Sequence, residues 1–327
     1  MDHCRTIVQP LIASAQEEVL MTTFLYDPSS DCAHAINDAL IALNKNGRKI
    51  RVNMVICTVS ELRFGLTGWN WKTLPSLRNV FAHGLSPASS STFLLPNADQ
   101  IPNINLTVKT FFTWPLGAIH SKLLIVDGWK FAAGSKNMDG NDGYEYLAEL
   151  HGDVAMSARM DFQNVWEESL PSLSTPIPSI SNPVPMLYLG RTPNSSMFQA
   201  PQGASQNVAW ITAINHAKTS IYIQTPGFVT DATLSAIEQA VRRGVHVTVV
   251  TAFYWQNFFE KWYTHSVGDN RQSAHQLYST LADDPAALAR FKLCYFLGKR
   301  VDPPQPQKKE WSHVKFMAID ESYMIFG

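Results

Sequence analysis

The chain contains one short pattern twice, and this duplication is the feature that most constrains its fold. Residues 120–127 read HSKLLIVD and residues 313–320 read HVKFMAID, so both copies have the form H-x-K-x4-D. Six residues separate each aspartate from a glycine, Gly134 in the first copy and Gly327 in the second. Two copies with the same further spacing indicate an internal repeat rather than a chance match. The sequence therefore predicts two halves of similar architecture.

Each copy places a histidine and a lysine on one face of a strand. The four residues after each lysine are apolar, which is typical of a short buried strand. Side chains alternate between faces along a strand, so residues two positions apart point the same way. We expect His120 beside Lys122, and His313 beside Lys315. Each copy thus offers one nucleophilic or proton-transfer group next to one positive charge.

The first copy continues into a predicted hairpin. Asp127-Gly128 is a strong signal for a two-residue turn, so residues 129–133 should form the return strand. Gly134 and Ser135 then bring backbone N–H groups and a hydroxyl back beside the histidine and lysine. Such a group of donors is a good site for an oxyanion.

Residues 120–135 resemble the signature of the phospholipase D superfamily, H-x-K-x4-D-x6-G-S-x-x-N, and match it as far as Ser135, whereas Asn137 lies one position before the final asparagine of the signature. The second copy matches as far as Gly327, where the sequence stops, so we expect a fragment with an incomplete second repeat. The resemblance covers nearly the whole chain. It implies an α/β fold, a pseudo-symmetric duplication with two mixed β-sheets flanked by helices and the site between the halves.

The plan of the chain is consistent with two repeats. Residues 9–60 and 208–252 both read as helix, strand, helix and strand, with short connections that imply parallel strands and a right-handed crossover. A stretch rich in proline and serine lies between the halves. We therefore divide the chain into a first repeat at 1–169, a linker at 170–206 and a second repeat at 207–327.

Two insertions complete this plan. Residues 253–310 are predicted to insert into the second half and to contain helices at 273–282 and 285–293, the latter capped by Asp284. Residues 61–119 form an insertion with many turn residues and several aromatic residues. These aromatics either pack the insertion onto the core or enter a lipid surface. They are Trp69, Trp71, Phe111, Phe112 and Trp114.

Composition bears on the partners and the cellular location of the protein. The formal net charge is −1, which argues against electrostatic binding of nucleic acid by the chain as a whole. The four cysteines show no paired spacing and are predicted to be reduced thiols. No apolar run of transmembrane length and no secretory signal is present. We expect an intracellular monomer, either cytoplasmic or in peripheral contact with a membrane.

The resemblance implies two-step chemistry through a phosphohistidine. One imidazole attacks phosphorus, and the other protonates the leaving oxygen and then deprotonates water or an alcohol. By what the first and second motifs of the family usually do, His120 is the nucleophile and His313 the acid. The residues alone leave that order open.

The remaining motif residues have supporting roles. Lys122 and Lys315 would balance charge on the phosphate oxygens, while Ser135 and Asn137 would donate hydrogen bonds. Because two lysines supply the positive charge, we expect neither a metal nor another cofactor. The motif aspartates point to the opposite strand face from the histidines. We assign a structural role to four residues: Asp127, Asp320, Gly134 and Gly327.

A histidine nucleophile needs an orienting partner on its other ring nitrogen. Residues 145–149 read as an alternating strand with Glu145 and Glu149 on one face. Similar enzymes keep a glutamate about this far past the motif, so we assign the role to Glu145, with Glu149 as second choice. The alternative is a solvated strand face.

The leading hypothesis is a phosphodiesterase of phospholipase D type. It would hydrolyse phospholipids or transfer their phosphatidyl group to an alcohol. A nuclease of the same superfamily, acting on DNA or RNA, is the second hypothesis and needs a basic groove with stacking aromatics. The third is an inactive relative that serves as a binding protein, against which the intact histidines and lysines argue.

Overall fold

The protein is described by a computed structural model that covers the chain in two compact units. The first unit comprises Met1–Asn141 and Leu147–Ser196, and the second comprises Asp142–Tyr146 and Met197–Gly327. A short piece that follows the first motif in sequence therefore belongs to the second unit. The residues whose structure is described are 3–57, 84–112, 118–140, 143–191, 204–253, 269–296 and 312–327.

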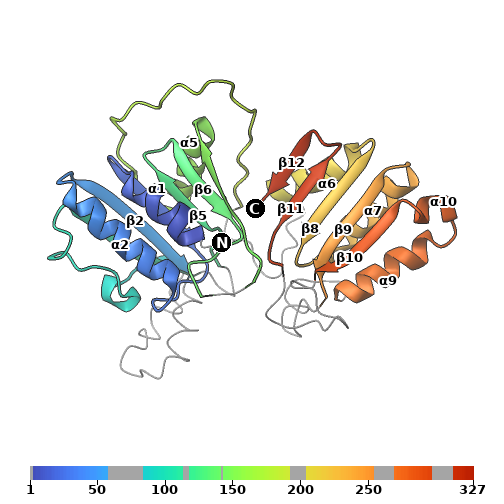
Figure 1. Ribbon diagram of the computed structural model, residues 1–327, viewed down its shortest axis with the longest axis horizontal. Coiled ribbons are helices and arrows are strands. Elements are labelled where there is room, and N and C mark those ends of the chain that lie inside the picture. The colour runs from blue at the N-terminus through green and yellow to red at the C-terminus, as the bar shows by residue number, and fades with distance from the viewer. Residues whose placement is uncertain are drawn as a thin grey trace. The chain divides into compact units, whose positions relative to one another are not determined.

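The first unit is built on a seven-stranded mixed sheet in the order β3-β4-β2-β1-β5-β6-β7 (Figure 1). Strands β1, β2 and β4 are parallel, and the other four pair antiparallel with their neighbours. The strands are β1 (Glu18–Thr23), β2 (Ile50–Cys57), β3 (Gly84–Pro87), β4 (Ile104–Phe112), β5 (Leu123–Val126), β6 (Lys130–Gly134) and β7 (Leu147–His151).

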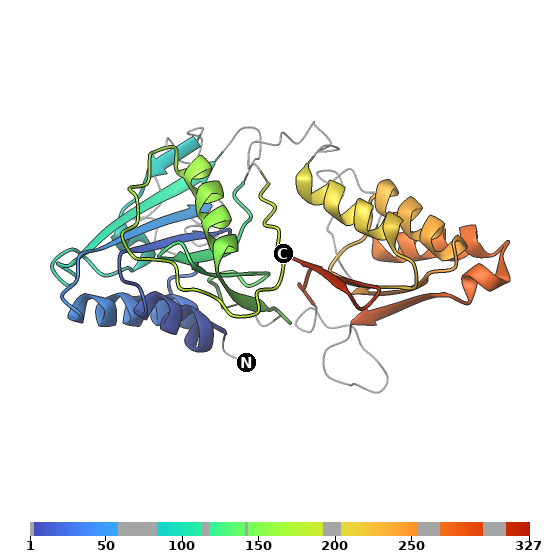
Figure 2. The same ribbon diagram turned by 90° about the horizontal axis from the view of Figure 1, so that it is seen from above.

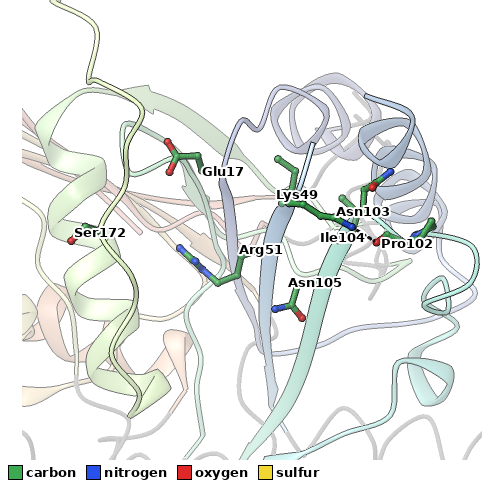
Figure 3. A pocket seen from close by; sticks show the side chains of 9 residues that line it. Glu17, Lys49, Arg51, Pro102, Asn103, Ile104, Asn105 and Ser172 are labelled. Atoms are coloured by element: carbon green, nitrogen blue, oxygen red, sulfur yellow. Dashed lines mark hydrogen bonds between the residues drawn. The ribbon is translucent and has the colours of Figure 1, made fainter. Parts of the chain in front are cut away.

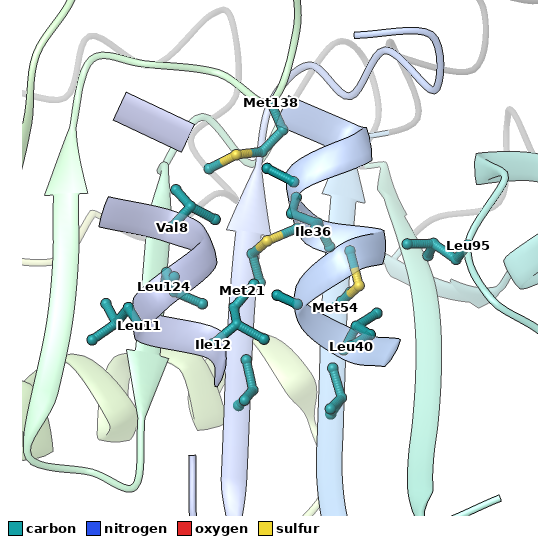
Figure 4. Packing of buried hydrophobic residues seen from close by; sticks show 14 of the residues in the cluster. Val8, Leu11, Ile12, Met21, Ile36, Leu40, Met54, Leu95, Leu124 and Met138 are labelled. Atoms are coloured by element: carbon teal, nitrogen blue, oxygen red, sulfur yellow. The ribbon is translucent and has the colours of Figure 1, made fainter. Parts of the chain in front are cut away.

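Helices cover both faces of this sheet (Figure 2). The π-helical turn η1 (Cys4–Val8), α1 (Gln9–Ala13) and α2 (Asp31–Lys45) bury the larger core on one face. Figure 4 shows Ile12 and Ile36 from these helices packed against Met21 and Met54 from the strands. Helix α5 (Asp153–Trp166) covers the other face. A short 3-10 helix, η3 (Ser90–Phe93), follows β3.

Helix α2 forms where its sequence predicts it. Its apolar residues recur every three or four positions and are buried on one side, from Ala33 to Leu43. Ser30 caps the first turn by accepting a hydrogen bond from the Ala33 N–H at 3.1 Å. Gly47 follows the helix with φ of 71°, a conformation that glycine adopts without steric cost.

The second unit has a five-stranded mixed sheet in the order β10-β9-β8-β11-β12. Strands β8, β9 and β10 are parallel, whereas β11 and β12 are antiparallel. The described helices pack through one apolar core on one face of the sheet (Figure 2). The elements are α6 (Ser205–His216), β8 (Ser220–Thr225), α7 (Asp231–Arg242), β9 (His246–Ala252), α9 (Asn270–Leu281), α10 (Pro285–Leu288), β10 (Phe291–Phe296), β11 (Phe316–Ile319) and β12 (Tyr323–Phe326).

The duplication predicted from the sequence is present in both units, as are the α/β class and the two mixed sheets flanked by helices. In each, a helix, strand, helix and strand precede an antiparallel hairpin that carries the motif. The domain limits 1–169, 170–206 and 207–327 stay a prediction. Described residues of the predicted linker contact the first unit: Glu17 accepts hydrogen bonds from the backbone N–H groups of Ser174 and Thr175.

Two secondary-structure predictions are wrong. The predicted helix at 285–293 ends at Leu288, and Phe291–Phe296 is strand β10, parallel to β9. Lys292 and Cys294 alternate there with larger apolar residues, which suits a strand better than a helix. The return strand of the first hairpin begins at Lys130 rather than residue 129, because three residues separate the paired positions.

The prediction of four reduced cysteines is also wrong. Cys4 and Cys32 form a disulfide that joins η1 to the first turn of α2, with Cα atoms 5.0 Å apart. Cys57 and Cys294 are free. The disulfide forms because η1 and α2 pack against each other. This packing cannot be inferred from the spacing of the two cysteines in the sequence. A disulfide is typical of an oxidising compartment, so the cysteines no longer support the expectation of an intracellular protein.

Two aromatics of the first insertion belong to the core. Phe111 and Phe112 end β4 and are 3% and 6% exposed, so they do not face lipid. The other three, Trp69, Trp71 and Trp114, lie outside the described residues. Within the described part of the chain, no helix has the length and apolar character needed to cross a bilayer.

Candidate active site

Both motifs enter their sheets beside the same end of the first strand. In the first unit β5 is antiparallel to β1, with Leu123 paired to Thr22, near the carboxyl end of β1. In the second unit Phe316 is paired to Gln224, near the carboxyl end of β8. The histidine and lysine of each motif precede these pairs. Each unit therefore presents its motif at the carboxyl edge of its parallel strands.

The aspartate of the first motif anchors its hairpin to the backbone. Asp127 and Gly128 both have positive φ, 51° and 66°, in the three-residue loop 127–129 that joins β5 to β6. The Asp127 carboxylate accepts hydrogen bonds from the backbone N–H groups of Gln16, Glu17 and Glu18 at 2.8, 2.8 and 2.9 Å. These bonds tie the hairpin to the connection that leads into β1.

The second aspartate makes the same contacts. Asp320 has φ of 52°, and its carboxylate accepts hydrogen bonds from the backbone N–H groups of Lys218, Thr219 and Ser220, just before and at the start of β8. Hydrogen bonds from Ser220, then Thr219 and Lys218, hold the pKa of this carboxyl well below its usual range. Neither set of contacts includes the motif histidine.

In the first motif the lysine lies against its histidine. Lys122 is buried, and its Nζ donates to the backbone carbonyl of His120 at 2.7 Å and lies 3.0 Å from His120 Nδ1. The ring of Phe24 contacts the imidazole, with centroids 4.5 Å apart. The two residues predicted to share a strand face thus lie together.

Ser135 and Asn137 are both buried in the loop that follows β6, at 1% and 4% exposure. The Asn137 side-chain oxygen accepts a hydrogen bond from the Leu25 N–H at 3.2 Å. Met138 bridges to Tyr26 just beyond β1. The loop is therefore fixed at the carboxyl edge of the sheet, where the first motif enters.

In the second motif the histidine is paired with a carboxylate. His313 is 8% exposed, and its Nδ1 lies 3.0 and 3.1 Å from the two side-chain oxygens of Glu145, which is 7% exposed. The Lys315 Nζ donates to the His313 carbonyl at 2.8 Å, as Lys122 does to His120. Both motif lysines therefore fold back onto the backbone of their own histidine, just before the strand begins.

The sequence assigns Glu145 to the nucleophile, His120, but the structure places its carboxylate on His313. The expectation that Glu145 and Glu149 share a strand face is wrong, because β7 begins at Leu147 and Glu145 precedes it. Glu149 instead lies 2.8 Å from Nε2 of His151, and both side chains are exposed.

The residues on either side of Glu145 also contact the second motif, and the sequence pattern does not reveal them. The backbone carbonyl of Tyr144 accepts a hydrogen bond from the His313 N–H at 2.9 Å. The hydroxyl of Tyr146 donates to the carbonyl of Lys315 at 3.1 Å. Two tyrosines around an acidic residue are the only local signal, and it carries no spacing rule.

A cavity of about 530 Å³ lies at the opposite edge of the first sheet (Figure 3). Its lining includes Lys49, Arg51 and Asn105, at the amino ends of β2 and β4. Lys49 donates to the Pro102 carbonyl at 3.1 Å, and Arg51 pairs with Glu18 at 2.6 Å. Because the first motif enters at the carboxyl end of β1, this cavity is not part of the motif site.

Metal ligands do not gather anywhere in the described ranges, where no group of three histidine, cysteine, aspartate or glutamate residues could hold an ion. The charged groups described at the motifs are the lysines and Glu145. What they can do chemically is bind an anionic group and move a proton to or from it.

Comparisons with known proteins agree with this arrangement. Residues 210–327 match the family model described as cardiolipin synthase, PLD-like domain. The crystal structure of phosphatidylserine synthase from Haemophilus influenzae Rd KW20 is similar, with a TM-score of 0.58, 12% identity, and coverage of 98% of this chain and 74% of that one. Polyphosphate kinase from Porphyromonas gingivalis is similar with a TM-score of 0.52, 9% identity, and coverage of 97% and 42%. No curated protein matches the chain.

Two motif-bearing α/β units with this topology define a phospholipase D-like fold. Residues 210–327 match a phospholipase D-like domain, and the fold of the chain as a whole is similar to that of phosphatidylserine synthase.

Proposed function

We propose that the protein is a phosphodiesterase of phospholipase D type, which hydrolyses phospholipids or transfers their phosphatidyl group to an alcohol. The observation that carries the proposal is the buried pairing of Glu145 with Nδ1 of His313. A carboxylate on Nδ1 fixes the ring orientation and leaves Nε2 to exchange a proton with substrate. A buried imidazole held in this way is arranged for acid–base chemistry.

In the first step the imidazole of His120 attacks the phosphorus atom through its unprotonated ring nitrogen. A P–N bond forms, the bond from phosphorus to the head-group oxygen breaks, and His313 gives its proton to that oxygen. In the second step His313 takes a proton from water or an alcohol as its oxygen attacks phosphorus. The P–N bond then breaks and His120 is regenerated.

The neighbours of the two histidines favour this order. The Glu145 carboxylate beside His313 stabilises a positive imidazolium, which is the form that an acid needs. The Lys122 ammonium, 3.0 Å from Nδ1 of His120, favours a neutral imidazole, which is the form that a nucleophile needs. The same lysine, with Lys315, would offset charge on the phosphate oxygens. Ser135 and Asn137 would donate hydrogen bonds to them.

The phospholipid substrate class is the finer part of the proposal. It is supported by the description of the matching family model, which names a cardiolipin synthase, and by the near-neutral charge of the chain. Nucleic acid stays the alternative substrate, and its cleavage is one outcome of the test.

The test measures head-group release from mixed phospholipid vesicles that contain a primary alcohol, with a chelator present. We expect a phosphatidyl-alcohol product from the wild-type protein and from His275→Ala, a control at an exposed histidine of α9, but none from His120→Ala. Intact vesicles together with cleaved single-stranded DNA would overturn the substrate class. No turnover of either substrate would favour an inactive binding protein.

A second measurement tests the order of the histidines. The protein is mixed with a radiolabelled phosphodiester, quenched in alkali and mapped by peptide. We expect the label on His120, and label on His313 alone would reverse the two roles.

A further inference from the structure

We propose that Tyr146 is a positioning residue that holds Glu145 against His313. The inference rests on the proposed function, because the geometry of this pair affects turnover only if His313 transfers a proton. It goes further by assigning a role to a residue outside the motifs. The argument comes from the segment 143–146, which follows the first motif in sequence and belongs to the second compact unit.

This segment is attached to the second motif at three successive residues. The Tyr144 carbonyl accepts from the His313 N–H, the Glu145 carboxylate meets His313 Nδ1, and the Tyr146 hydroxyl donates to the Lys315 carbonyl. Glu145 is therefore tethered on both sides to the residues that carry the catalytic histidine and lysine. The hydrogen bond before Glu145 joins two backbone groups, those of His313 and Tyr144. The hydrogen bond after it depends on the side-chain hydroxyl of Tyr146.

The surroundings of Tyr146 keep its hydroxyl protonated, so that it can donate a hydrogen bond. Burial is the main cause that raises the pKa of Tyr146 well above its ordinary value, and the nearby Glu145 carboxylate raises it further. A hydrogen bond with the Gly327 backbone has a smaller, opposite effect on this pKa. Tyr146 is thus a neutral hydrogen-bond donor throughout the pH range in which an imidazole can transfer protons.

The hydroxyl can be removed without disturbing the packing. The Tyr146 ring lies edge-on to Phe326 with centroids 6.3 Å apart, and phenylalanine would keep this contact. The Lys315 carbonyl would keep its hydrogen bond from the Gly327 N–H at 3.1 Å. The hydroxyl also lies 3.3 Å from the exposed Gly327 carbonyl, which water can reach. Tyr146→Phe therefore removes the hydrogen bond that follows Glu145 and leaves no buried acceptor without a partner.

Loss of the tether should weaken proton donation more than it weakens substrate binding. A small displacement of Glu145 lengthens its contact with Nδ1 and lets the His313 ring rotate away from the leaving oxygen. An alkoxide leaving group needs that proton, whereas 4-nitrophenolate leaves without it. The dependence of rate on the leaving group therefore separates a positioning role from a general structural one.

The experiment compares the single-turnover rate of leaving-group release, which precedes the second proton transfer, and KM for alkyl and 4-nitrophenyl phosphodiesters of the same lipid. For Tyr146→Phe we expect this rate on the alkyl ester to fall roughly five- to tenfold, in line with one lost hydrogen bond, with KM nearly unchanged and little loss on the 4-nitrophenyl ester. Tyr323→Phe is the matched control, because Tyr323 lies on the same hairpin and is 73% exposed. It should behave as wild type.

A double variant tests whether Tyr146 acts through Glu145. Adding Tyr146→Phe to Glu145→Gln should cost little beyond Glu145→Gln alone, since the tether then has nothing to position. Equal losses on both esters, or additive losses in the double variant, would overturn the inference. A wild-type protein that cleaves no phosphodiester would refute the proposed function, whereas an active wild type with an unaffected Tyr146→Phe would refute the positioning role alone.

Discussion

Both side-chain oxygens of Glu145 lie within 3.1 Å of Nδ1 of His313, although the two residues are 168 positions apart in the chain. The contact is buried, so water does not screen it. It joins a residue that follows the first motif to the histidine of the second. The surroundings of the His313 imidazole are therefore formed in part by a segment that the second half of the sequence does not contain.

The first prediction separates Glu145 from Glu149. Glu145→Gln should reduce turnover roughly a hundredfold, because an amide cannot stabilise the imidazolium that donates the proton. Glu149→Gln is the matched control and should be nearly neutral, since Glu149 is exposed and pairs with His151. Steady-state rates on a phosphodiester check both, and full activity in Glu145→Gln would remove its role.

The second prediction concerns the motif aspartate of the second unit. Asp320→Asn should lower the free energy of unfolding at neutral pH by about 1–2 kcal/mol, because a carboxylate accepts the backbone N–H bonds more strongly than an amide. The pKa of Asp320 is lower in the folded protein, so its stabilisation is present above the unfolded pKa of about 3.9 and is lost as pH falls through the folded value.

The difference in free energy of unfolding between wild type and Asp320→Asn should accordingly become smaller below about pH 4. Thermal unfolding followed by circular dichroism across that range checks the sign. Asp283→Asn serves as control, because that carboxylate is 70% exposed in its ion pair with Arg242 and should contribute little. If this stability difference grew as the pH fell, it would contradict the lowered pKa of Asp320 in the folded protein.

The third prediction concerns the disulfide. Reduction of Cys4–Cys32, or the double substitution of both residues by alanine, should lower the free energy of unfolding by roughly 2–4 kcal/mol. Denaturant unfolding with and without a thiol reductant measures the change, and mass spectrometry of the unreduced protein shows the cross-linked peptide. Cys294→Ser should not alter the response to reductant. Recovery of alkylated Cys4 without reduction would show that the bridge is absent.

The fourth prediction concerns Asn270, which is completely buried at the start of α9. Its side-chain nitrogen lies 2.7 to 2.9 Å from Pro226 O, Thr251 Oγ1 and Ala252 O, so it joins the carboxyl ends of β8 and β9 to the helix. Asn270→Ala should cost about 2–4 kcal/mol by leaving buried acceptors without a donor. Gln276→Ala, at an exposed position of α9, should be nearly neutral in the same unfolding assay.

The parts of the fold that local patterns decide could be predicted from the sequence. Helix α2 has regular apolar spacing and a glycine after its end, and the Asp127-Gly128 turn has a residue type that accepts positive φ at both positions. Strand β10 was not predictable, because a short apolar run is compatible with a helix or a strand until its neighbour is known. The candidate site divides in the same way. The prediction that the histidine and lysine share a strand face is wrong in detail, because both precede their strands, although each lysine still lies beside its histidine. The contact of Glu145 with His313 depends on tertiary structure.

The hydrogen bonds of Asp127 and Asp320 end on backbone groups that lead into the first strand of each sheet, and this has a consequence for how such a chain evolves. The aspartate closes the hairpin whether or not a histidine precedes it. A duplicated half can therefore lose its chemistry and keep its architecture. We expect descendants of this arrangement in which one half has retained aspartate and glycine but not histidine, and these should fold as well as their active relatives.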